Sequence, residues 1–155
     1  MTVRNYTTKI AVDKTILEIE NILVKFGARG IYKEYDGSHV SGIMFFILKD
    51  NQKIPFKIPI QLTKARTIII NAVNEGRLQK KYLEEPLRTD QAERVVFRII
   101  RDWIHSQLSL IEINFADTTE IFLPYLFDAV ENKTLYQKFL EKKESFIALE
   151  QMKGD

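Results

Sequence analysis

Basic residues recur at helical spacing along a segment that begins near Asp90. Arg94, Arg98 and Arg101 are separated by four and three residues, and His105 follows four residues later. Residues three or four positions apart lie on the same side of an α-helix, so these side chains form one stripe. Guanidinium groups bind phosphate and carboxylate oxygens through paired hydrogen bonds. The stripe therefore predicts an anion site.

Aromatic and basic neighbours extend this candidate site. Phe97 lies beside the stripe and could stack on a base, and the single tryptophan, Trp103, is a second aromatic candidate. A basic connection precedes the helix, whose N-terminal N–H groups and dipole favour anions. The predicted ligand-binding residues are Arg88, Arg94, Phe97, Arg98, Arg101, Trp103 and His105, with Arg77, Lys80 and Lys81 as a secondary basic loop.

The stripe also has a simpler interpretation as an exposed, solvated helix face. Asp90 stands four residues before Arg94, and Asp102 stands four residues after Arg98. Such pairs contribute only about 0.2–0.5 kcal/mol each and are typical of exposed helix faces. Trp103 likewise lies among isoleucines and valine, which favours a place in the core. Both interpretations remain open from the sequence.

Catalytic and metal-binding patterns have little support. The chain has no cysteine, which excludes disulfides, thiolate catalysis and cysteine-ligated metals. His39 and His105 lie in different elements without the spacing of a zinc site, and Asp117 and Glu120 fit helix capping. We therefore expect no catalytic residue, no metal and no cofactor, and a protein that is not an enzyme.

Composition indicates one globular domain in the α+β class. Of the 155 residues, 45% are hydrophobic and 28% are charged, which argues against disorder. Residues 1–88 carry 15 Lys/Arg and 9 Asp/Glu, a net charge of +6, whereas residues 89–155 carry 8 and 12, a net charge of −4. This asymmetry favours docking of the two parts, self-assembly or an anionic ligand, although solvated surface also accounts for it.

Hydrophobic periodicity and turn residues predict the order of elements in the first half. Asp13 or Thr15 could cap the first helix. The predicted elements are a short strand at Thr7–Ile10, a helix over Val12–Phe26, strands at Arg29–Tyr35, Val40–Lys49 and Lys53–Ile60, and a helix over Thr63–Glu75. Helix, antiparallel three-strand meander and helix thus form a unit over residues 1–76.

The strands differ in their surroundings. The third strand contains Pro55 and Pro59, which cannot donate ladder hydrogen bonds and predict a sheet edge. The middle strand, Val40–Lys49, is apolar on both faces, so we expect helices or another subunit to cover both.

The second half is predicted to be helical over residues 89–150. The arginine-bearing helix spans about Asp90–Ile113 with Thr89 or Asp90 as its cap, and a short apolar segment follows at Ile121–Phe127. The final helix, Lys133–Leu149, places four hydrophobic residues on its inner side: Leu135, Phe139, Phe146 and Leu149. No linker is evident, so residues 1–155 are predicted to form a single domain.

No membrane or export segment is expected. Met1–Thr8 is polar, and no apolar run approaches the roughly 18 residues that span a bilayer. We expect a cytoplasmic protein.

Several short segments resemble a family of short proteins from bacteriophages, prophages and mobile elements that has no settled biochemical activity. They are Asn5-Tyr-Thr-Thr-Lys-Ile, Pro55-Phe-Lys-Ile-Pro, Gln91-Ala-Glu-Arg and its continuation to Glu112, Phe122-Leu-Pro-Tyr and Lys133-Thr-Leu-Tyr. The resemblance implies a small protein made by an invading element inside a bacterium. It brings no functional residues with it.

Three functions fit these observations. The first expectation is non-enzymatic capture of a phosphate-bearing, nucleotide-like ligand by a homo-oligomer, which would sequester a host immune signal. The second is DNA or RNA binding during phage replication or recombination. The third is inhibition of a host protein through the two-faced strand or the acidic C-terminal helix.

Overall fold

The computed structural model describes the backbone of residues 3–152 and the side chains of residues 3–143. It confirms the α+β class. The helices are α1 (Val12–Lys25), α2 (Leu62–Asn74), α3 (Leu87–Glu112), α4 (Thr118–Phe122) and α5 (Leu135–Met152), with 3-10 turns η1 (Lys80–Leu83) and η2 (Leu123–Tyr125). The strands are β1 (Ala28–Asp36), β2 (His39–Lys49), β3 (Gln52–Pro59), β4 (Phe127–Asp128) and β5 (Lys133–Thr134).

The three long strands form the predicted antiparallel meander in the order β1-β2-β3. The β2–β3 turn holds Asp50 and Asn51 at φ values of 52° and 61°, a conformation that tight hairpin turns require and that these residue types tolerate. The predicted edge position of the proline-bearing β3 is confirmed, since only Leu126 adds an isolated antiparallel bridge to Phe56 within the described chain.

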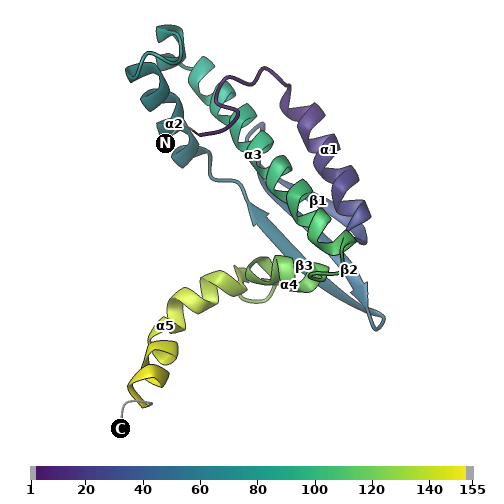
Figure 1. Ribbon diagram of the computed structural model, residues 1–155. Helices are drawn as coiled ribbons and strands as arrows, with labels where there is room; N and C mark the ends of the chain where they lie inside the picture. Colours follow the sequence, from purple (N-terminus) through teal and green to yellow (C-terminus); the bar gives the residue numbers. More distant parts are fainter. Residues whose placement is uncertain (1–2, 153–155) are drawn as a thin grey trace.

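One face of this sheet is covered by helices. In Figure 1, α1 and α3 run side by side across it, and α4 follows at the far end of α3. Phe45 and Phe56 point from the sheet into this layer and contact Phe122 of α4 at centroid distances of 5.1 and 5.9 Å. Because all three rings are at most 1% exposed, the main core lies here.

The opposite face of the sheet is more open than we expected from the two-sided apolar pattern of β2. Tyr32 is 59% exposed and Leu48 is 47% exposed. Phe46 is half-buried because its ring packs over Gly30 and Lys53 lies 4.8 Å from the ring centroid. Helices therefore cover one face, and the expected cover of the second face is present only in part.

Several predicted local features are wrong. Thr7–Ile10 is a turn and extended coil instead of a strand. Ala11 and Pro86 are the N-cap residues of α1 and α3, and neither caps its helix with its side chain; at α3 the Glu85 carboxylate instead accepts a hydrogen bond from the Thr89 N–H. The predicted caps lie inside the helices: Thr15 and Thr89 are buried, and Asp13 and Asp90 are in the first turns. The predicted role of Asp117 is confirmed, since its side chain accepts a hydrogen bond from the Glu120 N–H of α4.

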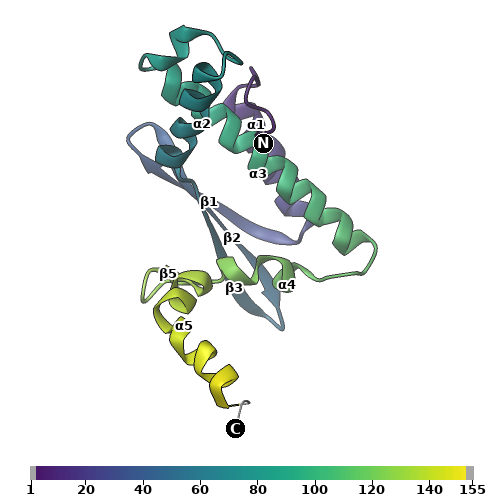
Figure 2. The ribbon, with the colours of Figure 1, turned by 60° about the vertical axis from the view of Figure 1, so that its left-hand side comes forward.

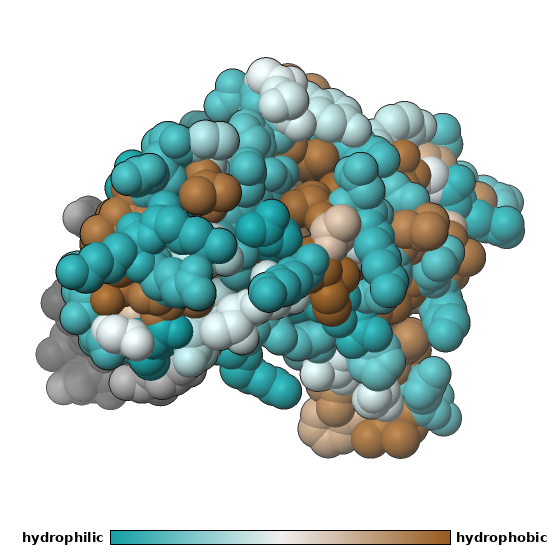
Figure 3. Space-filling model, turned by 90° about the horizontal axis from the view of Figure 1, so that it is seen from above, coloured by the Kyte–Doolittle hydropathy of each residue, from teal (hydrophilic) through white to brown (hydrophobic). Residues whose placement is uncertain are grey.

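The C-terminal elements project from the body of the molecule. The β4–β5 hairpin lies against β3, and α5 extends away from the sheet (Figure 2). The prediction that Leu135 and Phe139 face inward is wrong, because they are 38% and 42% exposed; Phe146 and Leu149 lie outside the described side chains. Seen from above, hydrophilic residues cover most of the surface and hydrophobic ones lie in separate groups (Figure 3). Within the described residues, every helix is too short or too polar to cross a membrane.

Candidate functional site

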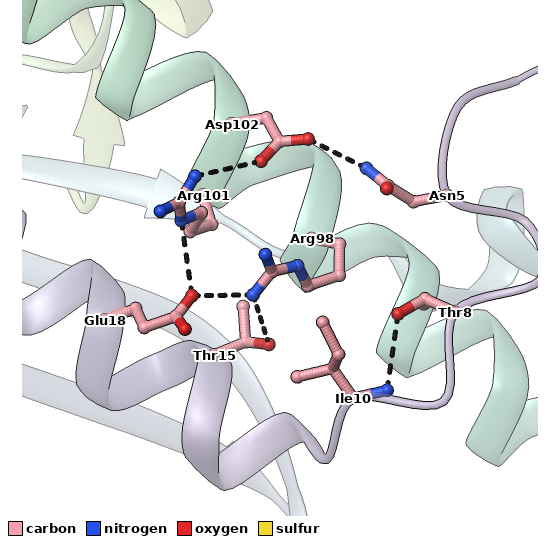
Figure 4. A network of polar contacts seen from close by, with 8 residues as sticks. All are labelled: Asn5, Thr8, Ile10, Thr15, Glu18, Arg98, Arg101 and Asp102. Carbon is pink, nitrogen blue, oxygen red and sulfur yellow. Dashed lines mark hydrogen bonds and ion pairs between the residues drawn. The ribbon is translucent and has the colours of Figure 1, made fainter.

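Arg98 and Arg101 of the arginine stripe face α1 (Figure 4). Arg98 donates from Nη1 to Oε2 of Glu18 at 2.6 Å and reaches the hydroxyl of Thr15 at 3.5 Å. Arg101 contacts the same Glu18 oxygen from Nε at 3.2 Å, as an ion pair without hydrogen-bond geometry, and reaches Asp102 at 3.3 Å. One carboxylate of α1 thus receives two guanidinium groups of α3.

The stripe also fastens the N-terminal segment. Arg94 donates twice to the side-chain oxygen of Gln91, at 3.0 and 2.6 Å, and Gln91 donates to the carbonyl oxygens of Tyr6 and Thr8. The predicted pairing of Arg98 with Asp102 is therefore replaced by contacts with α1, and that of Arg94 with Asp90 by a contact with Gln91, which links α3 to the N-terminal segment. Periodicity within one helix could not reveal them.

Asp102 completes this network from the other side of α3. Its carboxylate accepts a hydrogen bond from Asn5 at 2.9 Å. Partial burial raises the pKa of Asp102, but the hydrogen bonds from Asn5 and Arg101 and the nearby charge of Arg98 outweigh it and hold the pKa below its ordinary value. The network joins α3, α1 and the N-terminal segment, which is a structural task.

The predicted aromatic groups are not available on the stripe. Phe97 is fully buried in the main core, which leaves no ring face for a base. Trp103 is half-buried and makes edge contacts with Phe122 and Tyr125, both at 5.7 Å. His105 is exposed on the surface of α3.

The secondary basic loop is also dispersed. Arg88 pairs with Glu85 at 3.0 Å and donates to the carbonyl oxygen of Leu83. Arg77 binds Glu75, which raises the pKa of Arg77, and its guanidinium lies 4.8 Å from the ring centroid of Tyr6. Lys80 and Lys81 are exposed, and Lys81 lies over the ring of Tyr82. The structure does not bring the predicted residues together in one pocket.

A different basic pocket lies where the β1–β2 hairpin meets the beginning of α2. Its volume is about 410 Å³, within the usual range of roughly 300–1,000 Å³ for small-molecule sites. The residues that line it are Asp36, His39, Val40, Ser41, Ile60, Gln61, Leu62, Thr63, Lys64 and Arg66. The wall thus combines cationic and hydroxyl side chains with one carboxylate.

Arg66 distinguishes this pocket from the stripe. Its side chain is half-buried, its Nε is buried, and it has neither an ion pair nor a hydrogen bond among the described residues. Every other half-buried arginine in the described chain has at least one polar partner. Because removing a charge from water without compensation is costly, the guanidinium of Arg66 favours an anion from outside the chain.

The first turn of α2 adds to the positive potential. Gln61 is its N-cap, no described side chain caps the helix, and the first turn has no acidic residue. The first N–H groups of a helix have no intrahelical partner, and their dipoles favour negative charge. Lys64 lies in the same turn and lines the pocket.

His39 is positioned at the other wall by α3. Its Nδ1 lies 2.9 Å from Oε2 of Glu93, which is 9% exposed. An ionised carboxylate only accepts, so Nδ1 carries the proton in this contact and Nε2 is the second ring nitrogen. The sequence separation of 54 residues between His39 and Glu93 explains why spacing gave no signal for this pair.

Comparison with known proteins gives no indication of what the pocket binds. No protein-family model matches the chain, and no curated protein or solved structure is significantly similar to it. Within the described residues, histidine and carboxylate side chains form no cluster of three or more that could hold a metal ion. The pocket can bind an anion through Arg66 and Lys64, with His39, Ser41 and Thr63 as further polar groups.

Proposed function

We propose that this protein is a non-enzymatic binding protein that captures a phosphate-bearing small ligand in the pocket between β2 and α2. The observation that carries the proposal is the half-buried guanidinium of Arg66, which has no polar partner in the described chain. A phosphate group would supply the missing charge and accept hydrogen bonds from Arg66 and Lys64.

Nucleotides are the ligand class that fits best. The pocket is large enough for more than a phosphate ion, and Ile60, Leu62 and Val40 give it apolar wall area beside the cations. The resemblance to phage and prophage proteins supports sequestration of a host immune nucleotide signal as the biological setting. In this proposal the arginine stripe holds α3 against α1, and ligand binding belongs to α2.

Binding is tested by thermal shift and calorimetry with inorganic phosphate, pyrophosphate, mononucleotides, cyclic dinucleotides and ADP-ribose. A ligand at 100 times its Kd adds about 2.7 kcal/mol of stability to the folded state. We expect Arg66→Gln to weaken binding by about tenfold or more, since hydrogen bonds to charged groups contribute roughly 1.5–3 kcal/mol. Asp36→Asn should strengthen binding by removing a like charge from the wall.

Arg29→Gln is the matched control, because Arg29 is an exposed arginine on β1 outside the pocket lining. It should leave the Kd unchanged. The proposal fails if Arg66→Gln and Lys64→Gln bind as well as the natural chain. If a folded Arg94→Ala/Arg98→Ala variant lost binding while Arg66→Gln kept it, the ligand would bind at the arginine stripe and not in the pocket.

A second candidate function, binding of single-stranded nucleic acid, is favoured by the open face of the sheet. Tyr32 and Phe46 present aromatic rings there, and Lys53 and Lys57 come from the neighbouring strand. Stacking on such rings contributes about 1–3 kcal/mol per base. Affinity for an oligonucleotide would then fall steeply with salt and with Tyr32→Ala. A salt-insensitive or undetectable interaction would exclude this candidate.

A further inference from the structure

Helix α5 forms an arm that leaves the body of the molecule. Figures 1 and 2 show it extending away from the sheet and from the layer of α1 and α3. Its packing is chiefly with η2 and β5 at its first turns. In proteins most of a helix's stability comes from tertiary packing of its apolar face. The arm is therefore expected to have a partner surface.

The described part of the arm exposes apolar side chains on one broad face. Leu135, Tyr136 and Leu140 are 38%, 54% and 47% exposed. Residues 135 and 139 lie one turn apart on one side of the helix, and residues 136 and 140 lie one turn apart on the adjoining side. The same face opens onto a groove of about 430 Å³ whose lining is Leu123, Pro124, Leu135, Tyr136, Lys138, Phe139 and Lys142. Most of the lining residues are hydrophobic, which suits the apolar face of a helix as the occupant.

Charged residues at the base of the arm are already paired within the chain. Lys138 forms ion pairs with Asp128 and with Glu131, the latter at 3.5 Å. Lys133 pairs with Glu141 at 2.5 Å across the first turns of α5. These contacts fix the base of the arm on the β4–β5 hairpin and leave the apolar face outward.

We propose that the apolar face of α5 and its groove bind the α5 helix of a second copy of this chain, giving a two-fold symmetric dimer. The sequence supports a helix as occupant: Leu135, Phe139, Lys142, Phe146 and Leu149 follow each other at spacings of four, three, four and three, the repeat of paired helices. At about 1.5 Å per residue, the 18 residues of α5 span about 27 Å, enough for this whole repeat.

The charge pattern of α5 favours a second copy of this chain as the occupant over a partner whose surface is strongly positive or strongly negative. The arm sequence alternates both signs, with Lys142 and Lys143 between Glu141 and Glu144. A helix with both signs beside its apolar face complements its own copy in a two-fold arrangement, where each residue type meets the same surface on the other subunit. Lys142 within the apolar repeat costs some stability and selects the register and number of helices.

The mass in solution tests the proposal. One chain has a mass of 18.2 kDa, so sedimentation velocity or light scattering should give twice 18.2, or 36.4 kDa, with a monomer appearing on dilution. Leu135→Glu/Tyr136→Glu should convert the protein to a monomer with unchanged circular dichroism, because both side chains line the groove and are exposed. Leu17→Glu, at a leucine of α1 that is 57% exposed, is the matched control and should remain a dimer.

Cross-linking supplies a second readout. The chain has no cysteine, so Tyr136→Cys introduces a single thiol in the groove. A bis-maleimide should link two copies of this variant, and Leu17→Cys should give little linked product. A natural chain that is monomeric at all concentrations overturns the proposal. So does a dimer that survives Leu135→Glu/Tyr136→Glu, or one that Leu17→Glu dissociates.

Discussion

At the scale of single residues, the same residue type serves two purposes in this chain. The guanidinium groups of Arg98 and Arg101 meet Glu18, whereas that of Arg66 has no polar partner in the described residues. A charged side chain with a satisfied partner is a structural contact, and one without a partner points to a ligand. Whether a carboxylate of the chain lies within reach, more than the residue type, distinguishes a structural arginine from a candidate ligand-binding one.

The Arg98–Glu18 contact should contribute measurably to stability. The Arg98 side chain is 13% exposed and its contact with Glu18 is 2.6 Å. We expect Arg98→Met to lower the free energy of unfolding by about 1.5–3 kcal/mol, the usual contribution of a hydrogen bond to a charged group. Urea denaturation measures it. Arg29→Met, at an exposed position, is the control, and an equal effect of both variants would show that the contact contributes little.

Asp102 should make stability depend on acid pH. Its pKa in the folded protein lies below the ordinary value of 3.8, so its contribution to stability is present above 3.8 and is lost as the pH falls through the folded pKa. Asp102→Asn removes this titration. We expect the free energy of unfolding of the variant to fall less between about pH 5 and pH 2 than that of the natural chain. Parallel pH profiles would contradict the assignment.

At the scale of elements, Gly30 and Phe46 fix the packing between β1 and β2 on the open face of the sheet. A Cβ at Gly30 would lie 2.3 Å from Cε1 of Phe46, so the ring must move in Gly30→Ala. We expect a loss of about 1–3 kcal/mol, typical of overpacking. The double variant Gly30→Ala/Phe46→Ala should lose less than the sum of the single changes. Additive losses in chemical denaturation would show that the two residues do not interact.

The elements themselves were largely predictable from the sequence. Strict alternation in Lys53–Ile60 and the helical spacing of Ile16, Ile19 and Leu23 each identify an element and its buried face. Glycines 27 and 76, at φ values of 99° and 73°, mark the ends of α1 and α2. Local chemistry decides these features, so a single sequence reveals them.

The candidate site was not predictable in the same way. The arginine spacing correctly placed Arg94, Arg98 and Arg101 on one side of α3, but spacing cannot tell whether that side meets solvent or α1. The basic pocket joins residues of β2, α2 and the hairpin turn, and Glu93 reaches His39 from α3. Contacts between residues of different elements follow from tertiary packing, and the periodicity of one segment carries no information about that packing.

At the scale of the whole molecule, one core connects the meander with the helical second half. It includes α1 and sheet residues together with Phe97, Ile104 and Leu108 of α3 and Phe122 of α4. The stripe contacts join the same halves at the surface. A binding pocket on α2 and an arm at the C-terminal end are thereby attached to a single framework, since α2 also packs on α3.

Phe122 is the residue on which this connection depends most. It is fully buried and contacts Phe26 of the α1 end, Phe45 of β2 and Trp103 of α3. Phe122→Ala should lower the free energy of unfolding by about 3–5 kcal/mol, as for other buried phenylalanines. Phe115→Ala, at a phenylalanine that is 75% exposed, should change it little.

The same variant tests whether the chain unfolds as one unit. Trp103 is the single tryptophan, so its fluorescence reports on the contact of α3 with α4, while amide hydrogen exchange in β2 reports on the sheet. In a cooperative domain both probes must follow one transition. We therefore expect Phe122→Ala to lower the stability measured by both probes by the same amount. A lowered fluorescence midpoint with unchanged exchange in β2 would mean that the helical second half unfolds independently, and that the aromatic contacts of Phe122 do not couple it to the sheet.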